Sequence, residues 1–508
     1  MSRPGPIRTT LVAALALVLA ACAQQPRPQA GGGTGVAAAP ATVKTRSASE
    51  QRIGDENHQK ILQKYGGAYQ NTRLTNYVND LGRRIARVSE QPNEKWTFTV
   101  LDSPTINAFA LPGGYVYVTR GLVGLANSEA ELAGVIGHEI GHVTAGHGAL
   151  RQERATIATG ALLGAQILGA VLGADPNLIK GVTQVGQVAA GGILADYSRS
   201  DELAADNLGI RYLARSGYDP YAQADFLESM GASSSLDARM AGKSYNPNAT
   251  NFLASHPANG PRTRQAIQVA QNSGEVIPVG ASRNRDRFLQ IVDGIEYGDS
   301  AKQGFVRGRT FSHPELRFTY DSPRGFTIVN SAAAVTAKGP SNARFVLDGG
   351  RNPQGSLSNY IARTWAPAIA KQYRVGPLTG VQNRRLNGLE AATGYIPVQV
   401  NGKNFNAMLT AVRLNGKLYR LTGLVPQGSG LMSQVQEAVQ TFRALSPREA
   451  RNLKPQKIDV VRVRRSDTVA SLARRMNVDS FHEDRFRVLN ALGPNDRLKS
   501  GQRVKIIR

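Results

Sequence analysis

Cysteine is almost absent from this 508-residue sequence: Cys22 is the single one, so no disulfide bond can form within the chain. Acidic residues are also scarce, with 37 Asp and Glu against 61 Lys and Arg, which gives a formal net charge of +24. Such a charge favours anionic partners, namely nucleic acid, a lipid surface or an acidic cell-wall polymer. Because the sequence has no nucleic-acid-binding motif, we expect no nucleic-acid partner.

The N-terminal residues 1–21 predict a secretory signal, with a positive end, an apolar run and small residues before the cut. The sequence Leu19-Ala20-Ala21-Cys22 resembles a bacterial lipobox, whose cysteine is acylated. A plain signal peptide and a short transmembrane anchor are the alternatives, but the apolar run is short for a span. We therefore expect lipidation at Cys22. Ala23 after the cysteine suggests an outer-membrane lipoprotein that faces the periplasm of a Gram-negative-type cell.

Histidine is rare, with 7 in the chain, yet His138-Glu139-Ile140-Gly141-His142 places two of them four residues apart. On a helix these two rings share one face, and the intervening Glu139 lies close to whatever they bind. Ser128 and Glu131 predict a capping box at the start of that helix. The arrangement predicts a zinc site with Glu139 as general base. Two buried structural histidines are the alternative.

A zinc site for hydrolysis needs a third protein ligand and an open fourth position. Glu202 is our candidate, from a second predicted helix, and one Zn²⁺ per chain is expected. Asp206, one turn later, is placed to accept a hydrogen bond from a ligand histidine and fix its tautomer. Two solvated carboxylates on a helix face are the alternative interpretation for this pair.

The remaining histidines are expected to have different roles. His147 is half a turn out of phase with His138 on a helix and is expected near the helix C-terminus rather than at the metal. His58, His313 and His482 have no partner in the sequence and are expected to be structural or exposed. His256 could stabilise an oxyanion or occupy the open zinc position, although an ordinary loop histidine is the simpler interpretation.

The rest of the chain divides by composition and periodicity. Residues 22–49 predict a flexible tether. Residues 155–174 with 178–194 predict a helical hairpin beside the active site, with a transmembrane helix as the alternative. Residues 310–446 predict an α+β domain with an antiparallel sheet, which faintly resembles the PsbP/DcrB-like fold. Residues 458–508, in the order strand, helix, helix, strand, resemble a LysM module that binds peptidoglycan glycan. A small basic domain is the alternative.

Four separated motifs together resemble the HtpX/BepA-like zinc metallopeptidases, relatives of the CAAX prenyl proteases. They are residues 107–114 (Asn-Ala-Phe-Ala-Leu-Pro-Gly-Gly), the zinc helix, Ser198-Arg199 with Glu202 and Asp206, and Ser255-His256-Pro257. The resemblance implies zinc on His138, His142 and Glu202, with Glu139 catalytic. It also implies that His256 can cap the zinc. A further implication is an edge strand that pairs with an extended substrate, with residues Gly114, Tyr115, Val116 and Tyr117.

The fold class expected from this resemblance is α+β: a mainly helical, gluzincin-like peptidase domain over residues 50–300 with a small edge-exposed sheet, followed by the two C-terminal domains. The leading hypothesis is a lipid-anchored periplasmic zinc metalloendopeptidase that cleaves unfolded or misassembled envelope proteins. A peptidase acting on peptidoglycan cross-links and a non-catalytic scaffold between outer membrane and cell wall are the alternatives.

Overall fold

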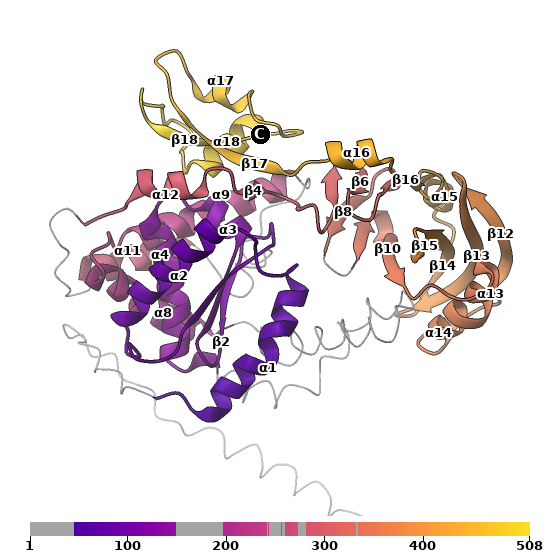
Figure 1. Cartoon of the computed structure of the whole chain (residues 1–508), viewed down its shortest axis with the longest axis horizontal. Helices are drawn as coiled ribbons and strands as arrows, with labels where there is room; N and C mark the ends of the chain where they lie inside the picture. The colour runs from indigo at the N-terminus through magenta and orange to yellow at the C-terminus, as the bar shows by residue number, and fades with distance from the viewer. Residues whose placement is uncertain are drawn as a thin grey trace, which may run out of the picture. The chain divides into compact units, whose positions relative to one another are not determined.

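The computed structural model describes residues 45–148, 197–240, 242, 256, 260–272, 281–331 and 334–508 (Figure 1). The predicted signal peptide, the predicted lipidation site Cys22, nearly all of the predicted tether and the predicted hairpin of residues 155–194 lie outside these ranges. Within the described residues, no helix has the length and apolarity that a bilayer crossing requires.

A helical region precedes the sheet-rich part of the chain. Its helices are α1 (Ala48–Lys64), α2 (Thr72–Arg87), α3 (Arg120–Leu125), α4 (Glu129–Thr144), α8 (Arg199–Arg215), α9 (Ala222–Met240), α11 (Gly260–Asn272) and α12 (Arg285–Val292). Helix α4 packs against α2, α8 and α9, and it is buried on nearly all sides. Its sequence is rich in Ala, Gly and Ile, so it can form the centre of the region without exposing apolar surface.

A small sheet of β1 (Thr97–Leu101), β2 (Ala108–Leu111) and β3 (Tyr115–Thr119) lies against these helices. The strand order is β1-β3-β2, with β3 parallel to β1 and antiparallel to β2. The family resemblance implied an exposed edge strand at Gly114 to Tyr117. This prediction is wrong, because β3 is the central strand and its backbone is hydrogen-bonded on both sides.

The sheet-rich middle of the chain is α+β and largely antiparallel, as expected from its alternating strands. An eight-stranded sheet has the order β11-β13-β14-β15-β10-β9-β8, with β12 also paired to β13, and a second sheet has the order β16-β7-β6-β5. The strands are β5 (Phe305–Arg307), β6 (Thr310–His313), β7 (Phe318–Asp321), β8 (Thr327–Asn330), β9 (Val335–Lys338), β10 (Arg344–Gly350), β11 (Arg374–Val375), β12 (Thr379–Leu386), β13 (Leu389–Val400), β14 (Lys403–Leu414), β15 (Lys417–Pro426) and β16 (Arg443–Ala444).

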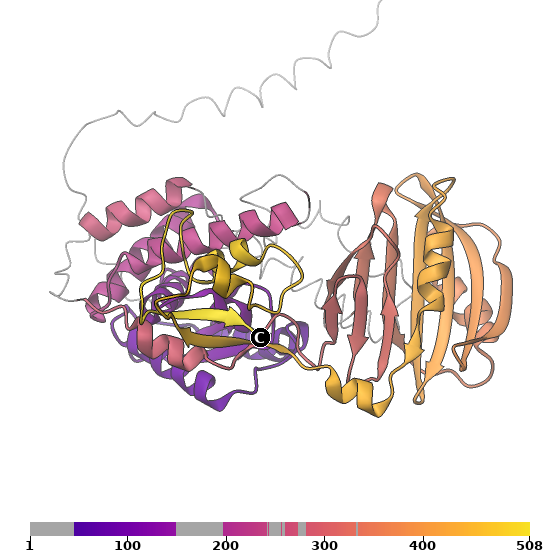
Figure 2. The same ribbon diagram turned by 90° about the horizontal axis from the view of Figure 1, so that it is seen from above.

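Helical segments cover parts of these sheets. They are η1 (Pro340–Asn342), α13 (Leu357–Tyr360), η2 (Ile361–Trp365), α14 (Ala366–Ala370) and α15 (Met432–Gln440). Helix α15 packs on β7, β14 and β15, so it contacts both sheets (Figure 2). Apolar side chains form separate cores on the two faces of the large sheet, as its long buried strands require.

The C-terminal segment follows the expected order of strand, helix, helix and strand. After α16 (Pro447–Asn452) come β17 (Gln456–Arg462), α17 (Val469–Ala473), α18 (His482–Leu489) and β18 (Arg503–Ile507). Strand β17 pairs with β18 and also with β4 (Glu296–Tyr297), which follows the helical region. Leu472 and Val504 belong to the same hydrophobic core as Ile136 of α4. The segment is thus packed into the helical region, and its LysM-like identity stays a prediction.

Lys505 of β18 is fully buried in this contact. Its Nζ donates hydrogen bonds to the carbonyl oxygens of Gly124 (2.8 Å), Leu125 (3.0 Å) and Ala126 (2.7 Å), at the end of α3. These carbonyls have no partner within a helix that stops there. The C-terminal strand therefore caps α3 just before α4 begins.

Candidate functional site

The N-terminus of α4 is fixed by its own side chains. Ser128 Oγ accepts a hydrogen bond from the Glu131 N–H (3.2 Å), and the Glu131 carboxylate accepts one from the Asn127 N–H (2.8 Å). The predicted capping box is therefore present in modified form, since the return bond comes from the residue before the cap. From this start, residues 138 and 142 fall one above the other on the face of α4 toward α8.

His138, His142 and Glu202 come together as the sequence predicts. The two imidazole Nε2 atoms are 3.0 Å apart, and Glu202 lies 3.3 Å from His142 Nε2 through Oε1 and 3.6 Å from His138 Nε2 through Oε2. Glu202 stands in the first turn of α8, where the helix dipole favours a carboxylate. All three side chains are buried.

The close approach of α4 and α8 depends on Gly209. A Cβ at that position would lie 2.9 Å from the backbone nitrogen of His138. Side chains larger than hydrogen would push the helices apart, and with them Glu202 from the histidines.

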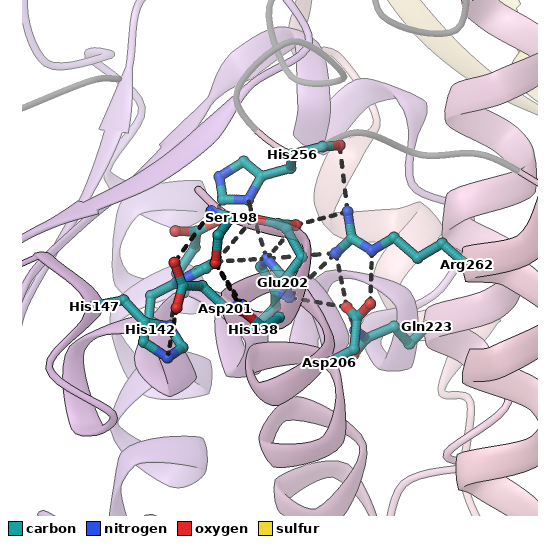
Figure 3. A network of polar contacts seen from close by, with 12 residues as sticks. His138, His142, His147, Ser198, Asp201, Glu202, Asp206, Gln223, His256 and Arg262 are labelled. Atoms are coloured by element: carbon teal, nitrogen blue, oxygen red, sulfur yellow. Dashed lines mark hydrogen bonds and ion pairs between the residues drawn. The ribbon is translucent and has the colours of Figure 1, made fainter. Parts of the chain in front are cut away.

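His256 joins the cluster from outside these helices (Figure 3). Its Nδ1 lies 2.7 Å from Glu202 Oε1 and 3.1 Å from His138 Nε2. One donor atom from each of the four residues His138, His142, Glu202 and His256 lies within 4.8 Å of the others. Donors at zinc bond lengths of about 2.0–2.1 Å on a tetrahedron are about 3.3 Å apart. The distances between the histidine nitrogens and the carboxylate oxygens of this cluster are similar, so the four residues fit a shared zinc ion.

Glu139 lies on the inner side of the same cluster. It is fully buried, and neither carboxylate oxygen accepts a hydrogen bond from a described residue. Burial raises the pKa of Glu139 above its ordinary value, although the charges of His256 and His138 oppose the shift. Its Oε1 is 3.6 Å from His256 Nε2. A carboxylate with two unused acceptors beside a metal site is suited to take up a proton.

Asp206 lies behind His138, as expected from its position one turn after Glu202. Its Oδ1 is 2.9 Å from His138 Nδ1, so it can fix the tautomer that leaves Nε2 for a metal. Gln223 Nε2 donates to the same oxygen (2.7 Å). Burial opposes ionisation of Asp206, but Arg262 and His138 outweigh it and lower the carboxyl pKa.

Arg262 of α11 was not foreseen from the sequence. It is buried, its Nε donates to Asp206 Oδ2 (2.6 Å), and its Nη1 forms an ion pair with Glu202 Oε2 (2.8 Å) and donates to the His256 carbonyl (3.2 Å). One guanidinium thus contacts three members of the site. The signal that could have revealed it is its place with Ala266 and Ala270 on the buried face of α11, where an unpaired charge would be costly.

Two further residues surround His142. His147 Nδ1 is 2.9 Å from His142 Nδ1, so this histidine supports a ligand ring although it cannot reach the same metal position. Tyr197 stacks on His142 with ring centroids 3.6 Å apart. Sequence analysis predicted only a position near the helix end for His147 and did not identify Tyr197.

The ionisation of the cluster follows from its neighbours. For Glu202, burial raises the pKa, but His256, His142 and Arg262 outweigh it and hold the pKa well below its usual range. For His142, burial is dominant and lowers the pKa, so the ring stays neutral. Burial also acts on His138, but its pKa is raised on balance by Asp206 and Glu202. One ionised carboxylate with imidazole nitrogens is a donor set that zinc prefers.

The sheet edge nearest the site belongs to β2. This strand packs against α4, and a small pocket joins Leu111 and Pro112 at its end to His142 and Tyr197. Among the described residues β2 pairs only with β3, so its outer edge carries free backbone groups.

The segment of the chain that carries the site matches a known protein family. Residues 72–269 match the model of peptidase family M48. The putative beta-barrel assembly-enhancing protease of Vibrio cholerae is 34% identical over 187 residues, covering 36% of this chain and 38% of that protein. The beta-barrel assembly-enhancing protease of Escherichia coli K12 is 30% identical over 223 residues, covering 42% of each chain. Mitochondrial metalloendopeptidase OMA1 of Schizosaccharomyces pombe is 30% identical over 220 residues, covering 42% of this chain and 59% of that protein.

The chain thus spans less than half the length of these two bacterial relatives. Among solved structures, cyanobacterial PsbP from Synechocystis sp. PCC 6803 aligns over 28% of this chain and 98% of its own, at a TM-score of 0.22 and 14% identity. The PsbP/DcrB-like resemblance of the middle domain stays a prediction.

Proposed function

We propose that this chain, whose residues 72–269 belong to peptidase family M48, hydrolyses peptide bonds within protein substrates at a zinc centre held by His138, His142 and Glu202. The observation that carries the proposal is the convergence of these donors from two helices, with Glu139 buried beside them and unused by any described hydrogen-bond donor. A structural zinc site would have no use for that carboxylate.

The residues of the site have distinct roles in this proposal. A zinc ion at such a centre supplies a Lewis acid that activates water and polarises the scissile carbonyl. Glu139 accepts the water proton and passes it to the leaving amine, which its raised pKa favours. Asp206 orients His138, and Arg262 holds Asp206 and Glu202 in place.

We further propose that His256 keeps the enzyme latent. With its Nδ1 in the cluster, four protein donors surround the metal position, whereas catalysis needs one position open to water. His256 must move before substrate can bind. The oxyanion role is less well supported, because the ring lies among the metal donors themselves.

Substrate would bind in extended form along β2. Its free edge and the pocket that leads from its end to His142 favour this strand over β3. Given the names of the bacterial relatives, we propose unfolded or misassembled envelope proteins, including outer-membrane β-barrel proteins, as substrates, and a periplasmic enzyme tethered to the outer membrane through Cys22. Peptidoglycan contact through the C-terminal segment is the second candidate role.

The test is Glu139→Gln in the full chain, assayed on an unfolded protein such as reduced casein, with bound zinc measured by mass spectrometry. We expect proteolysis to fall by at least about a thousandfold while one zinc per chain remains. Glu228→Gln, a change at an exposed glutamate of α9, is the matched control and should retain activity. Retained activity in Glu139→Gln would reject the assignment. Hydrolysis of purified sacculi but not of unfolded protein would favour the peptidoglycan alternative.

A further inference from the structure

The middle domain has a cavity of about 640 Å³ that the proposed protease function does not use. Its walls come mainly from β6 and β7 of the smaller sheet and from β10 and β15 of the larger one, with Gln303 and, from the helical region, Gly66 at the border. Ligand pockets commonly have volumes of about 300–1,000 Å³, with mostly apolar walls and a few placed polar groups.

The inner wall of the cavity is aromatic. Phe318 of β7 meets Tyr419 of β15 with ring centroids 4.9 Å apart, and Phe311 lies 5.8 Å from Phe318. The hydroxyl of Tyr419 is buried and has no hydrogen-bond partner among the described residues. Leaving such a group unpaired is unfavourable unless something in the cavity can bond to it.

A glycine keeps the space above Tyr419 open. Gly349 of β10 is the direct cross-strand neighbour of Tyr419. Neighbours in register point to the same face, so a side chain at 349 would enter the cavity. A Cβ at Gly349 would meet nothing closer than the Leu418 carbonyl at 3.9 Å, and the position does not need a positive φ. The glycine is therefore not required by the backbone.

The charges around the cavity are positive on balance. Lys302 and Lys417 line it and are exposed. Asp348 also borders it, but both of its oxygens accept hydrogen bonds from Arg420, at 2.7 and 2.8 Å. Burial lowers the pKa of His313 to about 4, so this ring is neutral near pH 7. Among the described residues that line the cavity, no other acidic group is present to pair with the two lysine ammonium groups.

We propose that this cavity binds an anionic amphiphile, with its apolar chain between the two sheets over Phe318 and Tyr419 and its acid group at Lys302 and Lys417. The complementarity of an apolar wall and a basic rim selects a molecule with one apolar end and one negative end. The occupant is a monomeric acid such as a fatty acid, because a volume of about 640 Å³ suits a single small molecule.

The test is titration calorimetry of the full chain with laurate below its critical micelle concentration. Dodecyltrimethylammonium, which has the same chain and a positive head, is the comparison ligand. We expect one laurate per chain and binding of the cation that is at least about tenfold weaker. Equal affinity for the two amphiphiles would overturn the proposal.

Variants separate a specific site from attraction to a basic protein. Lys302→Glu with Lys417→Glu should weaken laurate binding about tenfold or more, whereas Lys371→Glu with Lys403→Glu, two exposed lysines of the same domain, should leave it unchanged. Gly349→Phe should fill the cavity and abolish binding while both rim lysines remain. Equal loss in the two charge-reversed variants would overturn the site, as would full affinity in Gly349→Phe.

The bilayer is the other source of anionic amphiphiles. Vesicles of phosphatidylglycerol, tested by co-sedimentation with the same variants, distinguish it. Binding to vesicles without binding to laurate would overturn the proposal of a monomeric ligand.

Discussion

Arg262 and Asp206 form a bidentate ion pair behind the candidate metal site: Nε to Oδ2 is 2.6 Å and Nη2 to Oδ1 is 2.7 Å. Because Asp206 in turn contacts His138 Nδ1 at 2.9 Å, the guanidinium, whose Nη2 lies 3.4 Å from the same nitrogen, sets the orientation of a ligand ring mainly through Asp206.

Arg262→Lys should lower zinc affinity about 10–100-fold, because lysine keeps the charge but cannot donate to both oxygens in one plane. Competition with a fluorescent chelator measures the change. Arg264→Lys, on the exposed face of the same helix, is the control and should bind zinc as the unmodified chain does. Equal zinc affinity in the two variants would show that Arg262 has no positioning role.

His256→Ala should raise kcat/KM on unfolded protein several-fold, since it opens the fourth donor position. His482→Ala, far along the chain in α18, is the control. Peptide hydrolysis under single-turnover conditions separates a faster chemical step from tighter binding. A loss of activity in His256→Ala would instead indicate that the ring acts on the substrate.

Gly209→Ala should destabilise the helical region by about 1–3 kcal/mol, because the new methyl group would meet the His138 backbone. The same variant should bind zinc more weakly, since α8 carries Glu202. Gly349→Ala, where a Cβ meets open space, is the control. Calorimetric Tm values that do not differ between the two would contradict the tight packing of α4 on α8.

Lys505→Met should lower the stability of the helical region by about 3 kcal/mol, because the buried carbonyl groups of Gly124 and Ala126 lose their donor, while that of Leu125 keeps the Asn127 side chain. Lys499→Met, an exposed lysine in the same segment, should have little effect. Hydrogen exchange of α3 and α4 should increase in Lys505→Met. Unchanged protection there would mean that the carbonyls find other partners.

The middle domain should lose stability as the pH falls from about 6.5 to about 4. The folded-state pKa of His313 is lowered by burial to about 4, whereas the unfolded value is about 6.5, so between these values the unfolded chain binds a proton that the folded chain does not. The contribution is fully present above pH 6.5 and amounts to at most about 3 kcal/mol, since the side chain is mostly buried. In His313→Gln the Tm difference between pH 7 and pH 5 should shrink, and an unchanged difference would refute the assignment.

The sequence was sufficient for the part of the site that local spacing determines. His138 and His142 share a face by helical periodicity, Glu202 and Asp206 do so likewise, and the match to peptidase family M48 confirms the metallopeptidase resemblance. Arg262 could not be found this way. Its partners lie 56 and 60 residues away on another helix, and nothing in the local pattern of α11 tells which helix its buried face meets.

Strand order was the other failure, and it has the same cause. Alternation predicts that residues 115–119 form a strand, but which strands flank it depends on pairings outside the segment. In the C-terminal segment the order of elements was predictable but the packing was not. Its order of elements was predicted, whereas its apolar residues pack with Ile136 rather than forming a core of their own.

The hydrogen bond from Lys505 to Gly124 joins residues 381 positions apart, with the whole sheet-rich domain between them in the chain. A proteolytic cut in one of the exposed turns of that domain would break the polypeptide. It would leave intact the hydrophobic core that the helical region and the C-terminal segment form together. The two fragments would remain associated through apolar burial and the β4–β17 pairing, and the metal-binding helix would keep its support.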